Sequence, residues 1–360
     1  MSFSFRFSGD DIQEDPDDVD PQMQQEQGHQ SSNDAGPPPL PAKSHDLDEM
    51  LSSLPSKISY STLNLTSPLN NTTLLPRRSL FDVRLQLMAE DTLTTPSTTL
   101  LDASSDLTTN IYEGGYKTWE CSLDLARYLL DRGPRKSLDD LVRVGHVIEL
   151  GCGSALPSLV CFAYALREGV GMNVTVTDYN VDVLRLVTLP NFLLTWVSTL
   201  SVVQSAAVFG DDVENPFSGA EEEGDLYVTP KLIGAFRQHL DEAGIVLTFV
   251  SGSWSQVEDF LGLVPSAEDI NTFVLASETI YSPESCRSFT LAMTALMRRV
   301  KMGKAVVAAK RVYFGVGGSV DGFRMECAEQ GAIASEVEFE GLGGEGEGGV
   351  RRCLVEVQMY

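Results

Sequence analysis

A short glycine loop, Glu149-Leu150-Gly151-Cys152-Gly153, follows a run of apolar residues that is typical of a buried strand. Glycine in such a loop lets a ligand approach the backbone where a β-carbon would collide with it. Twenty-five residues after Gly153, a second apolar run ends in Asp178, whose carboxylate can accept hydrogen bonds from a ribose diol. Together these features predict a nucleoside-containing ligand at the carboxyl ends of two strands.

Two classes of nucleoside cofactor fit this loop. A dinucleotide-binding loop carries a third glycine three residues after the second, and that position is Leu156 here. The acidic lead-in at Glu149 and the acid at the end of the second strand fit S-adenosylmethionine (SAM) better. The residues therefore favour SAM over a dinucleotide, although a glycine pair alone is most often a structural turn.

The elements that must position these residues alternate between strand and helix periodicity. Strands are predicted at residues 144–150, 174–177, 245–250, 272–276 and 305–309. Helices are predicted at residues 123–130, 156–166, 181–189 (ended by Pro190) and 286–301. A last pair, 333–339 and 353–358, flanks a Gly/Glu-rich turn and predicts a hairpin. This order predicts an open, doubly wound α/β sheet with an antiparallel C-terminal hairpin.

The regions outside this core differ in composition. We expect residues 1–75 to be a disordered, acidic and Pro-rich tail, because its first 50 residues hold 12 acids against Arg6 and Lys43. Two apolar islands within it could dock on the body or on a partner: Phe3, Phe5, Phe7, and Leu47, Met50, Leu51, Leu54. Residues 76–110, with a strand at 83–87, are predicted to pack on the core as an extension. Residues 111–360 form the main domain, with an acid-rich surface insertion at 208–242.

The overall charge limits the partners. Lys and Arg number 26 against 51 Asp and Glu, a formal net charge of −25. Such a surface repels nucleic-acid phosphates and anionic lipid and attracts basic partners, although acidic tails can also serve solubility alone. The six cysteines and four histidines are scattered singly, so we expect no metal site and no disulfide framework. Without a secretory signal or an uncharged 18-residue apolar stretch, we expect a monomer of the cytoplasm and nucleus, including the nucleolus, with no membrane span.

Further motifs follow the predicted strands in a fixed order. They are Glu113-Gly114-Gly115-Tyr116-Lys117-Thr118-Trp119-Glu120-Cys121, Asp178-Tyr179-Asn180, Thr188-Leu189-Pro190-Asn191, Ser251-Gly252-Ser253-Trp254, Ser277-Glu278-Thr279-Ile280-Tyr281 and Tyr313-Phe314-Gly315-Val316-Gly317-Gly318. Over residues 111 to about 320 the chain resembles the eukaryotic protein-histidine methyltransferases that modify a large-subunit ribosomal protein, within the seven-β-strand methyltransferases. It departs from them in residues 208–242 and in Ala155-Leu156-Pro157, where relatives often carry glycine after Ser154.

This resemblance implies a Rossmann-like sheet of seven strands, SAM as the cofactor and a basic ribosomal protein as the partner. The segment Thr118, Trp119, Glu120, Cys121 and Ser122 is expected to cover the methionine part of SAM, with Gly151 and Gly153 beneath it. Asp178 is expected to hold the ribose, with Tyr179 and Asn180 beside the adenosine. Ser253 and Trp254 are expected to flank the adenine, and Glu149, Gly252 and Ser277 complete the cofactor set. Plain core packing is the alternative for both tryptophans.

Methyl transfer is an in-line displacement, so orientation and exclusion of water supply most of the catalysis. A histidine acceptor attacks as the neutral imidazole, which its ordinary pKa near roughly 6.5 allows at cellular pH. A polar group must orient the ring and later take its proton. Glu278 and Tyr281 are the catalytic candidates, with a helix cap as the structural alternative. The Gly315–Gly318 loop either shapes the acceptor entrance or is only a turn.

Three functions stay open on this reasoning. The first is methylation of a histidine in a basic ribosomal protein. The second is methylation of a lysine, by a neighbouring branch of the same superfamily. The third is a non-catalytic SAM-binding assembly factor that chaperones a basic ribosomal protein through its acidic segments.

Overall fold

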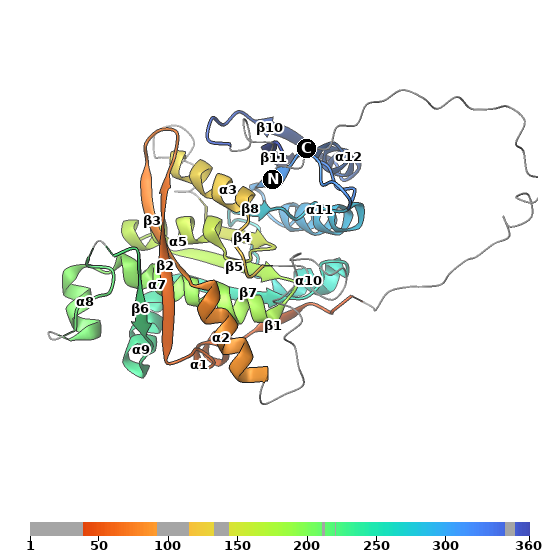
Figure 1. The fold of residues 1–360 in the computed structure, drawn as a ribbon. Helices are drawn as coiled ribbons and strands as arrows, with labels where there is room; N and C mark the ends of the chain where they lie inside the picture. The colour runs from red at the N-terminus through yellow and green to blue at the C-terminus, as the bar shows by residue number, and fades with distance from the viewer. Residues whose placement is uncertain (1–38, 92–114, 133–143, 211–212, 220, 343–349) are drawn as a thin grey trace, which may run out of the picture. The chain divides into compact units, whose positions relative to one another are not determined.

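One large sheet forms the centre of the computed structural model, which describes residues 39–91, 115–132, 144–210, 213–219, 221–342 and 350–360 (Figure 1). Within these residues the sheet has eight strands in the spatial order β1-β7-β5-β4-β8-β9-β11-β10. In that order their bounds are Lys43–His45, Ile245–Ser251, Met172–Asp178, His146–Leu150, Thr272–Ser277, Gly303–Lys310, Arg352–Met359 and Ala332–Val337. Strands β7 to β9 run parallel, whereas β11 is antiparallel to both neighbours and β1 is antiparallel to β7.

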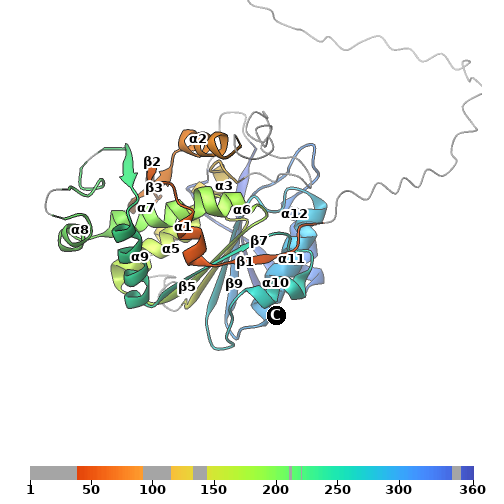
Figure 2. The ribbon, with the colours of Figure 1, turned by 90° about the horizontal axis from the view of Figure 1, so that it is seen from below.

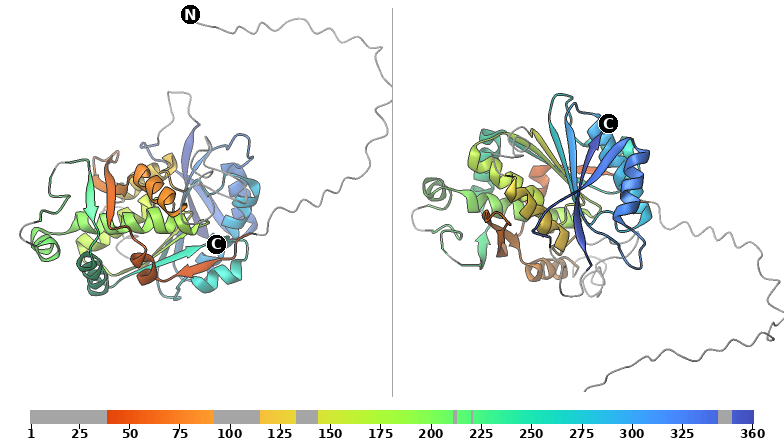
Figure 3. Two further views of the ribbon diagram at one scale, coloured as in Figure 1. Left: turned by 60° about the horizontal axis from the view of Figure 1, so that its bottom comes forward. Right: turned by 90° about the horizontal axis from the view of Figure 1, so that it is seen from above.

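Helices cover both faces of this sheet (Figures 2 and 3). One face carries α3 (Glu120–Asp131), α5 (Leu156–Glu168), α7 (Leu189–Thr199) and α9 (Pro230–Ala243), and the other carries α10 (Val257–Leu263), α11 (Pro283–Arg298) and α12 (Val320–Glu329). Adjacent strand residues alternate between the two cores: Val147 packs with the first layer and Ile148 with the second. Because both faces are covered, the central strands are apolar at almost every position.

The predicted architecture is therefore confirmed. Each predicted core strand is present, and seven strands form a doubly wound sheet with the antiparallel β10–β11 hairpin at its end. The short strand β1 adds an eighth at the β7 edge. Helices α10 and α12 were not predicted.

A second sheet corrects the predicted extent of the disordered tail. Its antiparallel strands lie in the order β3 (Thr72–Arg78), β2 (Lys57–Thr66) and β6 (Glu223–Tyr227). Disorder through residue 75 is wrong from residue 43 onward, because alternate residues of β2 such as Ile58 and Tyr60 are buried. Composition averaged over the tail hides this alternation. Residues 1–38, with the Phe3, Phe5 and Phe7 island, lie outside the described residues.

Two helices flank these strands. In α1 (Leu47–Ser52), Met50 and Leu51 are buried, so the second apolar island docks on the body. The strand predicted at 83–87 is wrong, because this segment lies in α2 (Leu80–Asp91). Leu80, Val83 and Leu87 have helical spacing and pack in one small cluster. The rest of the predicted 76–110 extension lies outside the described residues.

The acid-rich segment 208–242 is not a surface insertion throughout. After α8 (Val202–Phe209), the chain supplies strand β6 to the second sheet and then α9, the helix that leads into β7. Leu232, Phe236 and Leu240 recur every four residues along α9 and are buried. The acids on which the insertion prediction rested lie before α9, and the prediction is wrong for residues 223–242.

Pro190 does not end the helix that it was predicted to end. The helix continues from α6 (Val181–Val183) through a π-helical turn (Leu184–Thr188) into α7. Proline in a helix lacks a donor and its ring collides with the carbonyl four residues earlier, and the wider π turn relieves both constraints. The run Val181–Thr199 is long and apolar enough to cross a membrane, but 78% of its apolar window is buried inside the protein, as in a core helix.

The packing of α7 yields a stability prediction. Phe192 is fully buried, and its ring centroid lies 5.0 Å from that of Phe162 and 6.1 Å from that of Phe249. We expect Phe192→Ala to lower the free energy of unfolding by about 3–5 kcal/mol, because it removes burial and leaves a cavity. Phe81→Ala on the exposed side of α2 is the control and should change it by less than roughly 0.5 kcal/mol. Urea unfolding measures both, and equal effects would contradict the assigned core.

Candidate functional site

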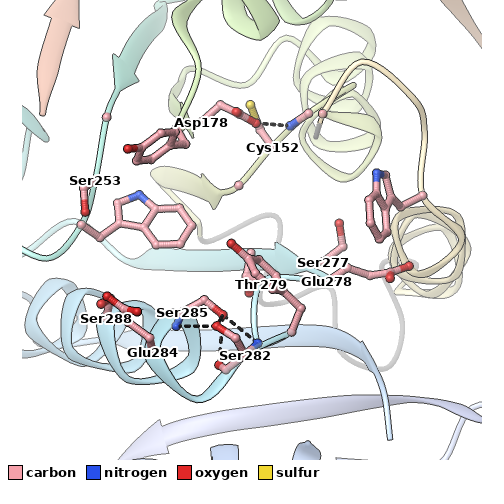
Figure 4. Close-up of a pocket in the computed structure, with 18 of the residues that line it drawn as sticks. Cys152, Asp178, Ser253, Ser277, Glu278, Thr279, Ser282, Glu284, Ser285 and Ser288 are labelled. Atoms are coloured by element: carbon pink, nitrogen blue, oxygen red, sulfur yellow. Dashed lines mark hydrogen bonds between the residues drawn. The ribbon is translucent and has the colours of Figure 1, made fainter. Parts of the chain in front are cut away.

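A cavity opens at the carboxyl ends of β4, β5, β7 and β8, where open α/β sheets bind ligands (Figure 4). Twelve residues predicted for the site line this one cavity: Trp119, Ser122, Gly151, Gly153, Asp178, Tyr179, Gly252, Ser253, Trp254, Ser277, Glu278 and Tyr281. They come from five separate segments of the chain. In Figure 4, Asp178 and Cys152 lie on one side, and Ser282, Glu284, Ser285 and Ser288 lie across from them along α11.

The glycine loop after β4 adopts a backbone that only glycine tolerates well. Gly151 and Gly153 have φ of +69° and +49°. A β-carbon on Gly151 would lie 2.7 Å from Cγ2 of Thr279, and one on Gly153 would lie 3.2 Å from the carbonyl oxygen of Gly115. The loop thus presents bare backbone to the cavity.

The carboxylate of Asp178 joins two loops at the cavity wall. Its Oδ2 accepts a hydrogen bond from the Gly153 N–H at 3.0 Å, and its Oδ1 accepts one from the Asn180 N–H at 3.2 Å. A carboxylate has about four acceptor positions, so it can also bind ribose hydroxyls while it holds these loops. Asp178 is therefore both a structural tie and a ligand-facing group.

Both tryptophans pack against other side chains and also line the cavity. Trp254 donates from Nε1 to Thr177 Oγ1 at 3.2 Å, and its ring lies 6.0 Å from that of Phe289. Trp119 precedes α3, and Lys310 Nζ lies 5.5 Å from its ring centroid. Each ring is only partly buried, and so keeps surface for a cofactor.

Five predicted cofactor residues stand behind the cavity walls. Thr118 donates to Ser154 Oγ at 3.0 Å, and Asn180 caps α6 through the Asp182 N–H. The Glu120 side chain is 62% exposed and points toward Lys310 and Arg352. The remaining two, Cys121 and Glu149, are fully buried. The structure thus gives these five residues supporting contacts and does not bring them into the cavity.

Glu149 anchors the start of α5. Its Oε2 accepts a hydrogen bond from the Ser158 N–H at 2.9 Å, in the first turn of a helix that has no side-chain cap of its own. Ala155, the residue immediately before α5, has a left-handed backbone conformation with φ of +58°. Burial raises the pKa of Glu149 to about 8, and the hydrogen bonds from Ser158 only partly oppose this effect.

Glu278 is bound by groups behind the cavity. Its Oε1 accepts a hydrogen bond from the Cys121 N–H at the start of α3 at 3.2 Å, and its Oε2 lies 3.1 Å from Lys310 Nζ. Its φ of +54° is unusual for a residue with a side chain. Glu278 is therefore a helix cap, as the structural alternative proposed, although the capped helix is α3 and not the one that follows it.

Tyr281 lines the cavity beside the glycine-rich loop. Its carbonyl oxygen accepts a hydrogen bond from the Gly318 N–H at 2.9 Å. A β-carbon on Gly318 would lie 2.1 Å from the Ile280 carbonyl oxygen, so this approach requires glycine. Val316 of the same loop lines the cavity. The loop is thus a tight turn and also part of the cavity rim.

Several lining residues escaped the sequence reasoning. The first turns of α11 contribute Ser282, Glu284, Ser285 and Ser288. Serines three residues apart share one helix face, a signal that was available but not used. Pro39 also lines the cavity, and no local sequence pattern predicts this position. Within the described ranges, no three His, Cys, Asp or Glu side chains gather as a metal site would require.

The geometry fits SAM. Bare backbone at Gly151 and Gly153 admits a closely packed ligand, and Asp178 offers acceptors for a ribose diol. The ring of Trp254 lines the same cavity and offers a flat aromatic face of the kind that packs on a purine.

Comparisons with known proteins give the following. No family model matches the chain. The histidine protein methyltransferase 1 of Schizosaccharomyces pombe is 38% identical over 81% of this chain and 79% of that protein. The protein of the same name from Saccharomyces cerevisiae is 36% identical over 90% of this chain and 89% of that protein. A histidine protein methyltransferase 1 homolog from Bos taurus is 31% identical over 70% of this chain and 57% of that protein. Among solved structures, the glycopeptide N-methyltransferase MtfA with sinefungin has 12% identity and a TM-score of 0.36, covering 69% of this chain and 90% of that one.

The raised pKa of Glu149 predicts a pH dependence of stability. The folded protein keeps the Glu149 proton up to about pH 8, whereas the unfolded chain loses it near the ordinary value of 4.5. The free energy of unfolding should therefore fall as pH rises through this window, by up to roughly 1.4 kcal/mol per pH unit. Glu149→Gln keeps an acceptor for Ser158 and cannot ionise, so it should become more stable relative to the unmodified protein from pH 5 to pH 8.

Urea unfolding without cofactor across this pH range measures the effect. Glu258→Gln, at an exposed position on α10, is the matched control and should follow the unmodified protein. If the free energies of unfolding of Glu149→Gln and the unmodified protein changed in parallel with pH, Glu149 would ionise equally in the folded and unfolded states, and the prediction would be wrong.

Proposed function

Because this chain belongs to the histidine protein methyltransferase 1 family, we propose that it transfers a methyl group from SAM to a histidine of a basic protein of the large ribosomal subunit. The match along four fifths of the fission-yeast relative is the observation that supports a histidine acceptor. The formal net charge of −25 supports a basic partner and disfavours naked RNA, whose phosphates it would repel. A ribosomal partner implies a protein of the cytoplasm and nucleus, and we take the monomer as the active form.

SAM supplies an electrophilic methyl group on a sulfonium centre when it is bound. The chain must hold the cofactor, exclude water and align a neutral imidazole with that methyl group. Asp178 would hold the ribose, the backbone of Gly151 and Gly153 would lie beneath the methionine part, and Trp119 would cover it. An attacking ring nitrogen carries no proton, so no strong base is required before transfer.

We divide the Glu-x-x-Tyr motif into two roles. Glu278 is a positioning residue, because its carboxylate holds the start of α3 and thereby the adjacent Trp119 against the cavity. Tyr281 lies on the same cavity wall with a side chain that can hydrogen-bond the imidazole. In this arrangement Tyr281 orients the acceptor ring, and after transfer the methylated imidazolium gives its remaining ring proton to solvent water.

Tyr281→Phe tests this division, because it removes only the hydroxyl. We expect kcat to fall on the order of 10²-fold, while the Kd for S-adenosylhomocysteine stays within twofold. Glu278→Ala should instead raise that Kd as well, since it removes the acceptor for the Cys121 N–H that holds the start of α3. Tyr227→Phe, an exposed tyrosine on β6, is the matched control. An unchanged kcat for Tyr281→Phe would remove Tyr281 from the reaction.

The acceptor is tested by incubating the protein with labelled SAM and large-subunit ribosomal proteins, followed by mass spectrometry of the labelled peptides. We expect one methyl group on a histidine, and none with the Asp178→Ala variant, which lacks the ribose-binding group. Label on lysine would contradict the histidine assignment. Label on a histidine of non-ribosomal proteins alone would keep the activity and overturn the ribosomal partner.

The non-catalytic alternative makes a different prediction. An assembly factor that needs only its acidic surface would restore ribosome assembly as fully with Asp178→Ala as with the unmodified chain. A methyltransferase would not restore histidine methylation with that variant. Assembly and methylation are therefore measured on the same cells.

A further inference from the structure

A short N-terminal segment crosses the carboxyl end of β7 at one edge of the cavity. We call residues 39–45 the strap. Its last three residues form β1 and pair antiparallel with the end of β7, with Lys43 opposite Ser251 and His45 opposite Phe249 (Figure 2). His45 Nε2 lies 2.7 Å from Ser251 Oγ. The strap therefore meets β7 where the loop that flanks the cavity begins.

The contact between the strap and that loop is made by backbone at very short range. Gly252 has a φ of +103°, and a β-carbon there would lie 2.4 Å from the Pro41 carbonyl oxygen and 2.9 Å from the Ala42 Cα. No side chain fits between the two segments. Gly252, one of the expected cofactor-binding residues, is thus also the residue on which the strap lies.

Hydrogen bonds join the strap to two cavity loops in a closed ring. The Gly252 N–H donates to the carbonyl oxygens of Asp178 at 3.0 Å and Tyr179 at 3.2 Å, which links the loops after β5 and β7. The Ser253 N–H donates to the Leu40 carbonyl oxygen at 2.9 Å. The Leu40 N–H then donates to the Tyr179 hydroxyl at 3.4 Å, which closes the ring.

The ring surrounds the part of the cavity expected to hold adenosine. Pro39 lines the cavity together with Tyr179 and Ser253, and Ala42 packs in the same cluster as Trp254. We propose that the strap is a third wall of the SAM site, which fixes Tyr179 and Ser253 against the adenosine and docks more firmly when the cofactor is bound.

The burial of the strap argues against a purely structural role. Pro39, Leu40, Lys43 and Ser44 are exposed, so the strap removes little apolar surface from water. Its contacts are mainly with the backbone of the two loops that face the cofactor. Binding that orders these loops must stabilise the docked strap, and by linkage the docked strap must strengthen binding by the same factor.

Hydrogen exchange on the full chain tests this coupling directly. We expect S-adenosylhomocysteine to slow amide exchange in peptides that cover residues 39–45, in parallel with the loops at 150–154 and 251–254. Slowed exchange in those loops with unchanged exchange in the strap would overturn the proposal. The measurement needs no acceptor, so it is independent of the proposed histidine substrate.

A pair of double variants measures the effect on affinity. In an edge strand alternate N–H groups face the neighbour, so Lys43→Pro with Ser44→Pro removes at least one donor to β7. We expect the Kd for S-adenosylhomocysteine to rise roughly tenfold or more, within the usual range of coupling between sites. Lys43→Ala with Ser44→Ala removes the same exposed side chains, keeps both donors, and should bind within twofold of the unmodified protein.

Thermal unfolding of each variant separates the outcomes. Weaker binding with an unchanged unfolding temperature supports the strap as part of the site. The proposal is overturned if the proline variant binds S-adenosylhomocysteine with unchanged Kd, or if both double variants lose affinity equally. If the proline variant does not fold, the exchange result on the unmodified chain decides the question alone.

Discussion

The site depends on the backbone and carboxylate of one residue, Asp178. Its carboxylate accepts hydrogen bonds from Gly153 and Asn180, and its carbonyl oxygen accepts one from Gly252. Loops that follow three parallel strands, β4, β5 and β7, therefore converge on a single position. Strand ends in a twisted sheet diverge, and these bonds hold the loops together so that one ligand can touch all three. The same residue lines the cavity, so the three loops meet at a position that a ligand in the cavity can reach.

Two glutamates extend this arrangement to the helices that form the walls. Helices α3 and α5 follow Trp119 and Ala155, neither of which caps its helix with a side chain. Glu278 supplies an acceptor to the first helix from the end of β8, and Glu149 supplies one to the second from the end of β4. An acceptor at a helix N-terminus satisfies an N–H that would otherwise be unpaired. Two acids that the sequence analysis proposed as site residues thus position the residues that line the cavity.

The sequence allowed the central sheet and most of the cavity to be predicted, because these depend on local signals. Apolar runs that end in glycine or an acid locate the strand ends, and parallel strands bring those ends together. What could not be predicted depends on contacts between distant segments. The alternation at Ile58 and Tyr60 becomes meaningful only when β6, far along the chain, pairs with β2. Pro39 reaches the cavity only because β1 adds to the far edge of β7. The side to which Glu278 turns follows from the position of α3, and the Glu-x-x-Tyr spacing carries no information about it.

The short strand β1 pairs with only part of β7, and this partial pairing bears on why the β7 edge of the sheet carries an extra strand. If β1 served only to protect an exposed edge, it would be expected to pair along the length of β7. It pairs with Phe249 to Ser251, the last three residues, and leaves Ile245 to Thr248 without a partner on that side among the described residues. The paired residues are those that lead into Gly252 and the cavity. Because edge protection does not account for so local a pairing, and because the strap buries little apolar surface, its position is best explained by the loop geometry that it imposes on the cofactor site.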